Sequence, residues 1–111
     1  MILQTHLLNN ALIADIQLKE ANLANAEQFK SELMSLINNG NKYVIVNFEQ
    51  VIYIDSSFLG ALVSALKLTM NSGGDIAVVG LNSDIRSLFQ LVRLDKVFRI
   101  YTNTQEALTG A

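Results

Sequence analysis

Cysteine is absent from the 111-residue sequence, and histidine occurs only once, at His6. Without cysteine the chain can form neither disulfide bonds nor thiolate metal sites, and one histidine cannot build a histidine cluster. Proline is absent too, and no linker-like segment or internal repeat interrupts the chain. A chain of this size suffices for one core. We therefore expect a single domain spanning residues 1–111.

Charged residues are few and nearly balanced, with a formal net charge of −2, and half of the residues are hydrophobic. This composition argues against intrinsic disorder and against a nucleic-acid binder that depends on a large basic field. No apolar run reaches the roughly 18 residues that suggest a membrane span, and no basic region precedes an apolar segment at the N-terminus. We expect a cytoplasmic protein with a protein partner, without direct contact with nucleic acid and without membrane insertion.

The N-terminal part predicts a hairpin followed by a helix. Two apolar pieces, residues 2–8 and 11–18, flank Asn9 and Asn10, a dipeptide that tolerates the positive φ of a tight turn. From Asn25 onward the apolar residues recur at helical spacing. Asn25 with Gln28 resembles a capping box, and residues 38–40 supply a stop.

The remaining chain alternates strand and helix patterns. Buried strands are predicted at residues 43–48 and 75–80, and a short strand at 97–101. Helices are predicted from Ser56 to residue 70, from Asn82 or Ser83, and after a cap at Thr102 or Asn103. The order predicts a mixed α/β fold with a mostly parallel sheet, an antiparallel N-terminal hairpin and about four helices.

Three consecutive polar residues, Asp55, Ser56 and Ser57, separate a buried strand from a helix. Asp55 is expected to cap the helix, which leaves the serines at its first positions. A phosphate on a serine there would meet the positive end of the helix dipole and free backbone N–H groups. A simple helix cap is the commoner meaning of such a tripeptide.

The order of these segments resembles the STAS (sulfate transporter and anti-sigma antagonist) family, and in particular its free-standing bacterial anti-sigma factor antagonists. The most specific element is the family pattern Asp-Ser-Ser-Gly-Leu-Gly, which Asp55, Ser56, Ser57, Leu59 and Gly60 match. The resemblance covers nearly the whole chain and implies a STAS-like single domain. It also implies a regulatory binding module of transcription, with no catalytic residues, no metal and no cofactor.

The resemblance further assigns roles to individual residues. Ser56 corresponds to the serine that is phosphorylated by a serine kinase, which is itself the anti-sigma factor. The unmodified protein would bind that kinase and release a sigma factor, and a phosphatase would reverse the modification. The partner-binding residues that it implies are Asp55, Ser57, Phe58, Leu59 and Gly60.

Phe58 stands where the family pattern has glycine. Its ring either fills the core or projects from the helix start as an interface anchor. Gly60 is interpreted as a point of close packing between helix and sheet, because glycine inside a helix costs about 1 kcal/mol relative to alanine. Asn47 lies within a buried strand and must find a hydrogen-bond partner or a water.

Two other functions compete with this interpretation. One is a constitutive STAS scaffold subunit of a signalling assembly or transport complex. The other is an enzyme with Ser56 or Ser57 as nucleophile, but His6 is the only histidine and no Gly-x-Ser-x-Gly elbow is present. No glycine loop of the phosphate-cradling kind precedes a helix, so nucleotide binding has no motif to support it.

The basic residues Arg86, Arg93, Lys96 and Arg99 predict a solvated face or a contact with an acidic group.

Overall fold

A computed structural model describes residues 1–110 of the chain. Its main sheet has five strands in the order β1-β2-β4-β6-β7. Their bounds are β1 Leu3–Leu8, β2 Ala11–Ile16, β4 Tyr43–Asn47, β6 Asp75–Val79 and β7 Arg99–Tyr101. β1 pairs antiparallel with β2, and every other neighbouring pair is parallel. The predicted mixed α/β fold with an N-terminal antiparallel hairpin is confirmed.

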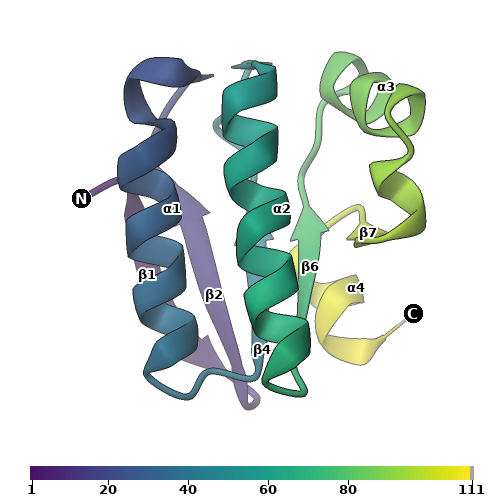
Figure 1. The fold of residues 1–111 in the computed structure, drawn as a ribbon. Helices are drawn as coiled ribbons and strands as arrows, with labels where there is room; N and C mark the ends of the chain where they lie inside the picture. Colours follow the sequence, from purple (N-terminus) through teal and green to yellow (C-terminus); the bar gives the residue numbers. More distant parts are fainter. Residues whose placement is uncertain (111) are drawn as a thin grey trace.

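Four α-helices accompany the sheet in residues 1–110, as Figure 1 shows. They are α1 Leu23–Asn38, α2 Ser56–Asn71, α3 Ser83–Leu91 and α4 Thr104–Thr109. A short 3₁₀ helix, η1 Leu94–Lys96, precedes β7, which begins at Arg99, two residues later than the strand predicted at 97–101. Two minor strands, β3 Glu20–Ala21 and β5 Tyr53–Ile54, form a separate parallel pair. Two residues are too few to show a periodic pattern, so the sequence did not predict this pair.

The hairpin turn forms as its asparagines predict. Asn9 and Asn10 have φ values of 51° and 69°, which is the combination that a two-residue hairpin turn requires. The turn fixes the register Leu8↔Ala11 to Leu3↔Ile16. β1 therefore becomes one edge of the sheet (Figure 1).

The two faces of the sheet are covered by different helices. α1 and α2 lie side by side over one face in Figure 1, and α4 packs on the other. The larger core includes Phe29 of α1 and Phe58 of α2, whose rings stack with centroids 4.1 Å apart. The smaller cluster, on the α4 side, centres on Ile45 and Ala107. Residues of β4 thus alternate between the two cores.

The start of α1 differs from the prediction. Its cap is Asn22, not Asn25, and the Asn22 side chain accepts a bond from the Ala24 N–H at 3.0 Å. Asn25 takes the other role in the box, because its side-chain oxygen accepts from the Asn22 N–H at 2.9 Å. Both asparagines come before the apolar residues that recur at helical spacing, so the local pattern fits either one as the cap.

The other helix starts agree with the sequence. Asn82 caps α3 through the Ile85 N–H, and Asn103 caps α4 through the Glu106 N–H. Within residues 1–110, no helix combines the length and the apolar character needed to cross a membrane.

Candidate functional site

Asp55 connects the starts of two helices. It is the cap of α2, since one carboxylate oxygen accepts the Phe58 N–H at 3.1 Å. The other oxygen accepts the N–H of Leu23, the first residue of α1, at 2.9 Å. The predicted cap of α2 is confirmed, and the bond to α1 is an addition that linear spacing could not reveal. One carboxylate therefore fixes the relative position of both helix starts.

Backbone bonds hold the chain that leads into this junction. The Asp55 N–H donates to the Ala21 carbonyl at 3.0 Å, and the Ile52 N–H donates to the Lys19 carbonyl at 2.8 Å. The Asn82 side chain also donates to the Ile52 carbonyl, at 3.3 Å. The cap of α3 thus also braces the segment before α2.

Ser56 is the first residue of α2, as expected, and it is exposed. Ser57 follows it and is half-buried. The first N–H groups of a helix have no partner inside the helix and carry its positive partial charge. The charge of Asp55 is shared between two N–H donors, one from each helix, which lessens its repulsion of an anion nearby.

Phe58 and Leu59 lie in the core. The Phe58 side chain is 0% exposed, and that of Leu59 is 6% exposed. Of the two alternatives for Phe58, core filling is therefore the one that the structure adopts. The ring occupies the space between α1 and α2, where it stacks on Phe29. In this conformation the side chains of Phe58 and Leu59 offer no surface anchor, and a partner would meet the backbone around them.

Gly60 does not serve close packing, so that interpretation is wrong. The residue is exposed, and a Cβ added there would have no atom within 4 Å outside its local helix backbone. Glycine inside a helix costs about 1 kcal/mol of stability relative to alanine. No packing contact within residues 1–110 of the isolated chain offsets this cost at Gly60. Because Gly60 follows Ser56 by four residues, the two share one face of α2.

Three large apolar side chains around the junction are exposed. Leu23 is 73% exposed, Ile52 63% and Tyr53 53%. Leu23 bonds to Asp55 through its N–H, and Ile52 and Tyr53 come just before Asp55 in the chain. We call Leu23, Ile52, Tyr53, Ser56 and Gly60 the junction face. No local pattern singles out Leu23, Ile52 or Tyr53, because the exposure of an apolar side chain at these positions depends on tertiary packing.

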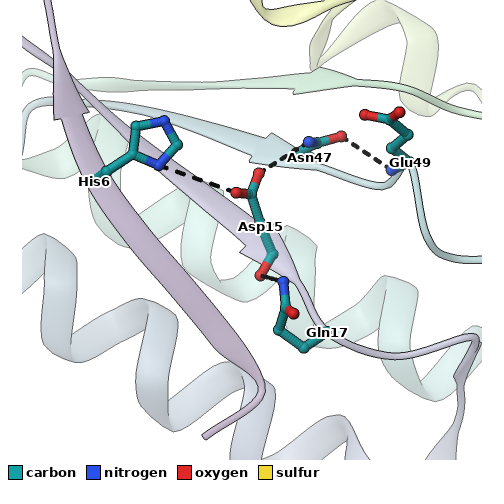
Figure 2. Close-up of polar contacts among 5 residues, drawn as sticks. All are labelled: His6, Asp15, Gln17, Asn47 and Glu49. Carbon is teal, nitrogen blue, oxygen red and sulfur yellow. Dashed lines mark hydrogen bonds and ion pairs between the residues drawn. The ribbon is translucent and has the colours of Figure 1, made fainter.

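Asn47 finds its partners at the carboxyl edge of the sheet, in the network that Figure 2 shows. Its amide donates to Asp15 at 2.9 Å and its oxygen accepts the Glu49 N–H at 2.9 Å. The other oxygen of Asp15 lies 4.0 Å from Nδ1 of His6. Gly80 passes so close that an added Cβ would lie 2.9 Å from the Asn47 side-chain oxygen. The network joins β1, β2 and β4 and has the character of a structural tie.

The basic residues predicted as a solvated face lie on α3, η1 and β7 and the turn between α3 and η1. Arg93, Lys96 and Arg99 are exposed, and Arg86 is half-buried. Arg99 pairs with Asp75 of the neighbouring strand β6 at 3.2 Å. An exposed pair of this kind contributes little to stability.

Comparison with known proteins connects this arrangement to a family. The family model described as STAS domain matches residues 12–107. A candidate anti-sigma factor antagonist of Thermotoga maritima is 34% identical over 91 residues, which cover 81% of this chain and 80% of the relative.

Solved structures show the same fold. The crystal structure of a candidate anti-sigma factor antagonist from Thermotoga maritima superimposes with a TM-score of 0.88 at 27% identity, covering 97% of this chain and 92% of that one. The phosphorylated form of the Bacillus cell fate determinant SpoIIAA gives a TM-score of 0.73 at 19% identity, with 96% of each chain covered. The second likeness is one of fold alone.

Proposed function

The chain belongs to the STAS domain family, and we propose that it is an anti-sigma factor antagonist switched by phosphorylation of Ser56. Unmodified, it binds an anti-sigma factor that is also a serine kinase, and so releases a sigma factor for transcription. Phosphorylated, it dissociates, and a phosphatase restores binding. The observation that carries the proposal is the exposed Ser56 at the first position of α2, within a face of exposed apolar side chains.

The junction face has the composition of a docking surface. Leu23, Ile52 and Tyr53 are each more than half exposed. The buried centre of an interface is more apolar than its rim, and tyrosine is enriched among the residues that carry most of the binding energy. Gly60 lets a partner approach the helix backbone without meeting a side chain. The buried Phe58 and the shared cap Asp55 support this surface from below, which keeps its shape fixed before binding.

Phosphorylation acts on this face through charge. A phosphoserine carries about −1.5 to −2 charges at neutral pH, and the five residues of the junction face supply no cation to pair with it. Burying that charge against a partner without a cation is costly. In the free protein, water and the positive end of α2 stabilise the phosphate. The free state is therefore favoured after modification.

The alternative of a constitutive scaffold predicts a different response to charge at Ser56. The test starts from a partner captured with the wild-type protein and uses titration calorimetry with three variants. Ser56→Ala should bind as tightly as wild type, and Ser56→Asp should bind at least about tenfold more weakly, since tenfold corresponds to about 1.4 kcal/mol. Ser57→Asp is the matched control for charge at the half-buried neighbour and should have the smaller effect. Equal affinity of Ser56→Asp and wild type would favour the scaffold.

The apolar part of the face is tested separately. Tyr53→Ala should weaken binding to the captured partner, whereas Leu91→Ala should leave it unchanged. Leu91 is a suitable control because it is also apolar and highly exposed, at 79%, but lies at the end of α3. Equal effects of the two variants would place the contact elsewhere.

A further inference from the structure

β1 is an edge strand without the usual protection. Five of its six residues are exposed, from Gln4 to Leu8. Natural edge strands commonly carry lysine, proline or a bulge that prevents pairing with another chain. β1 has no proline and no acidic or basic residue other than His6, and its pairing with β2 runs without interruption. Its outer side is therefore able to accept another strand.

The register of the hairpin determines which backbone groups point outward. In an antiparallel pair, residues that exchange hydrogen bonds alternate with residues that do not. A two-residue turn closes on a bonded pair, here Leu8 and Ala11, and at the far end the Gln17 N–H donates to the Ile2 carbonyl at 2.8 Å. Even-numbered residues of β1 therefore bond to β2, and Leu3, Thr5 and Leu7 direct their N–H and C=O groups outward.

Glu32 of α1 limits this free edge at one end. Its carboxylate oxygens accept the Ile2 N–H and the Leu3 N–H, each at 2.9 Å. The Leu3 donor is thereby occupied. Thr5 and Leu7 are left as the residues of β1 whose outward N–H and C=O groups are both available.

We propose that β1 pairs antiparallel with β1 of a second copy about a two-fold axis at His6. In this register Thr5 lies opposite Leu7 of the second copy, and Leu7 lies opposite Thr5, so each exchanges both of its free backbone bonds. A shift that centres the pairing on Thr5 would place Leu7 opposite Leu3, whose N–H is already bound to Glu32. The arrangement at His6 is thus the one that uses all the free groups.

The side chains fit the same register. Leu3, Thr5 and Leu7 share the sheet face on which α1 lies, because Leu3 belongs to the larger core and alternate residues share a face. Leu7 is 71% exposed. Next to Thr5, between β1 and α1, lies a hollow of about 390 Å³ whose lining includes Leu3, Thr5 and Leu36. Leu7 of the second copy, opposite Thr5, would enter this hollow.

Charge and symmetry favour a second copy as the occupant. β1 carries no aspartate, glutamate, lysine or arginine. Pairing with a second β1 therefore brings no like charges of these residue types opposite each other. A two-fold contact uses the same edge on both copies and closes, so the assembly stops at a dimer. The interface is small, which predicts a dimer of micromolar or weaker affinity.

Sedimentation of the whole protein from about 1 µM to about 1 mM tests the proposal over the range of weak affinities. Wild type should shift from monomer to dimer and go no further. Thr5→Pro removes an outward donor that β2 does not use, and should abolish the dimer while circular dichroism shows a folded chain. A monomer throughout, or assembly beyond a dimer, would overturn the proposal.

Leu7→Glu provides an independent variant with little risk to folding, because Leu7 is exposed in the single chain. It would place a carboxylate in the hollow that Glu32 also lines, and should weaken dimerisation at least about tenfold. Leu91→Glu, at a similarly exposed leucine on α3, is the matched control and should dimerise like wild type. A dimer that resists both Thr5→Pro and Leu7→Glu would contradict pairing through β1. This test needs no other protein, so its outcome is independent of the proposed switch.

Discussion

The two faces of the sheet differ in how much structure covers them. α1 and α2 have 16 residues each and enclose the larger core, whereas α4 has six residues and covers a small cluster. Ser56 lies on the side with the larger core, two residues before the buried Phe58. The residue proposed to switch binding is therefore mounted on the most strongly packed part of the molecule. Phosphorylation there is expected to change surface charge without unfolding the helix.

The strongest test of this difference removes the Phe58 ring. Phe58→Ala deletes a fully buried side chain that stacks on Phe29, and should lower the free energy of unfolding by about 3–5 kcal/mol. Leu108→Ala, in the α4 cluster, removes a half-buried side chain and should cost less than about 2 kcal/mol. Urea denaturation measures both. Equal losses would mean that the two faces contribute alike.

The shared cap should matter more than an ordinary cap. Asp55→Ala frees an N–H at the start of α2 and another at the start of α1, and should destabilise the protein by about 2 kcal/mol. Asn103→Ala, which frees the single capped N–H of α4, should cost about 1 kcal/mol. The comparison by thermal and urea unfolding sharpens the contrast between the helix starts. An Asp55 effect no larger than that of Asn103 would show that the bond to α1 contributes nothing.

The stability of the folded protein should depend on pH through the carboxyl group of Glu32 on α1. Partial burial by itself would raise the pKa of its carboxyl, but bonds donated by the Ile2 and Leu3 N–H groups and by Gln28 outweigh burial and lower the pKa below its ordinary value of 4.5. A lowered pKa in the folded state stabilises the protein above pH 4.5, and this contribution is lost as the pH falls through the folded-state value.

The variant Glu32→Gln isolates this contribution. At pH 7 it should be less stable than wild type by about 1 kcal/mol, and the difference should shrink as the pH falls below 4.5. Unfolding measured at a series of pH values checks the sign. A difference that grows toward acid pH would contradict the lowered pKa.

The smallest effect on stability is expected at Gly60, with the opposite sign. Gly60→Ala adds a methyl group to an exposed helix position where no atom lies within 4 Å of it outside the local helix backbone, and should stabilise the fold by up to about 1 kcal/mol. The same methyl group should weaken binding to the captured partner, because it stands on the junction face. Gain of stability without loss of affinity would remove Gly60 from the contact surface.

The sequence predicted the fold through its hydrophobic periods. The buried strand from Tyr43, the helix after Asp55 and the turn at Asn9 and Asn10 each carry a local pattern that the structure keeps. The sequence placed the cap of α1 at Asn25, whereas the structure has it at Asn22. Both asparagines lie just before the helical pattern, and asparagine is a favoured cap at either position. The bond between Asp55 and Leu23 joins residues 32 positions apart, and no local pattern encodes such a contact.

The sequence predicted only those features of the candidate site that depend on neighbouring residues in the chain. Asp55 and Ser56 were placed correctly because a cap and a first helical position are local properties. The exposure of Ile52 and Tyr53 depends on how β5 pairs with β3 and on the brace from Asn82, which are tertiary features. Gly60 was interpreted as a packing residue because its cost inside a helix is visible in sequence, whereas the open space around it is not.

The central claim, that charge at Ser56 expels the partner, is tested most directly with phosphorylated protein. Wild type incubated with its kinase is analysed by mass spectrometry to locate the phosphate, and its affinity for the captured partner is measured before and after modification. The account predicts phosphate on Ser56, loss of at least about tenfold in affinity, and no modification of Ser56→Ala. Phosphate on another residue, or undiminished affinity of the modified protein, would contradict it.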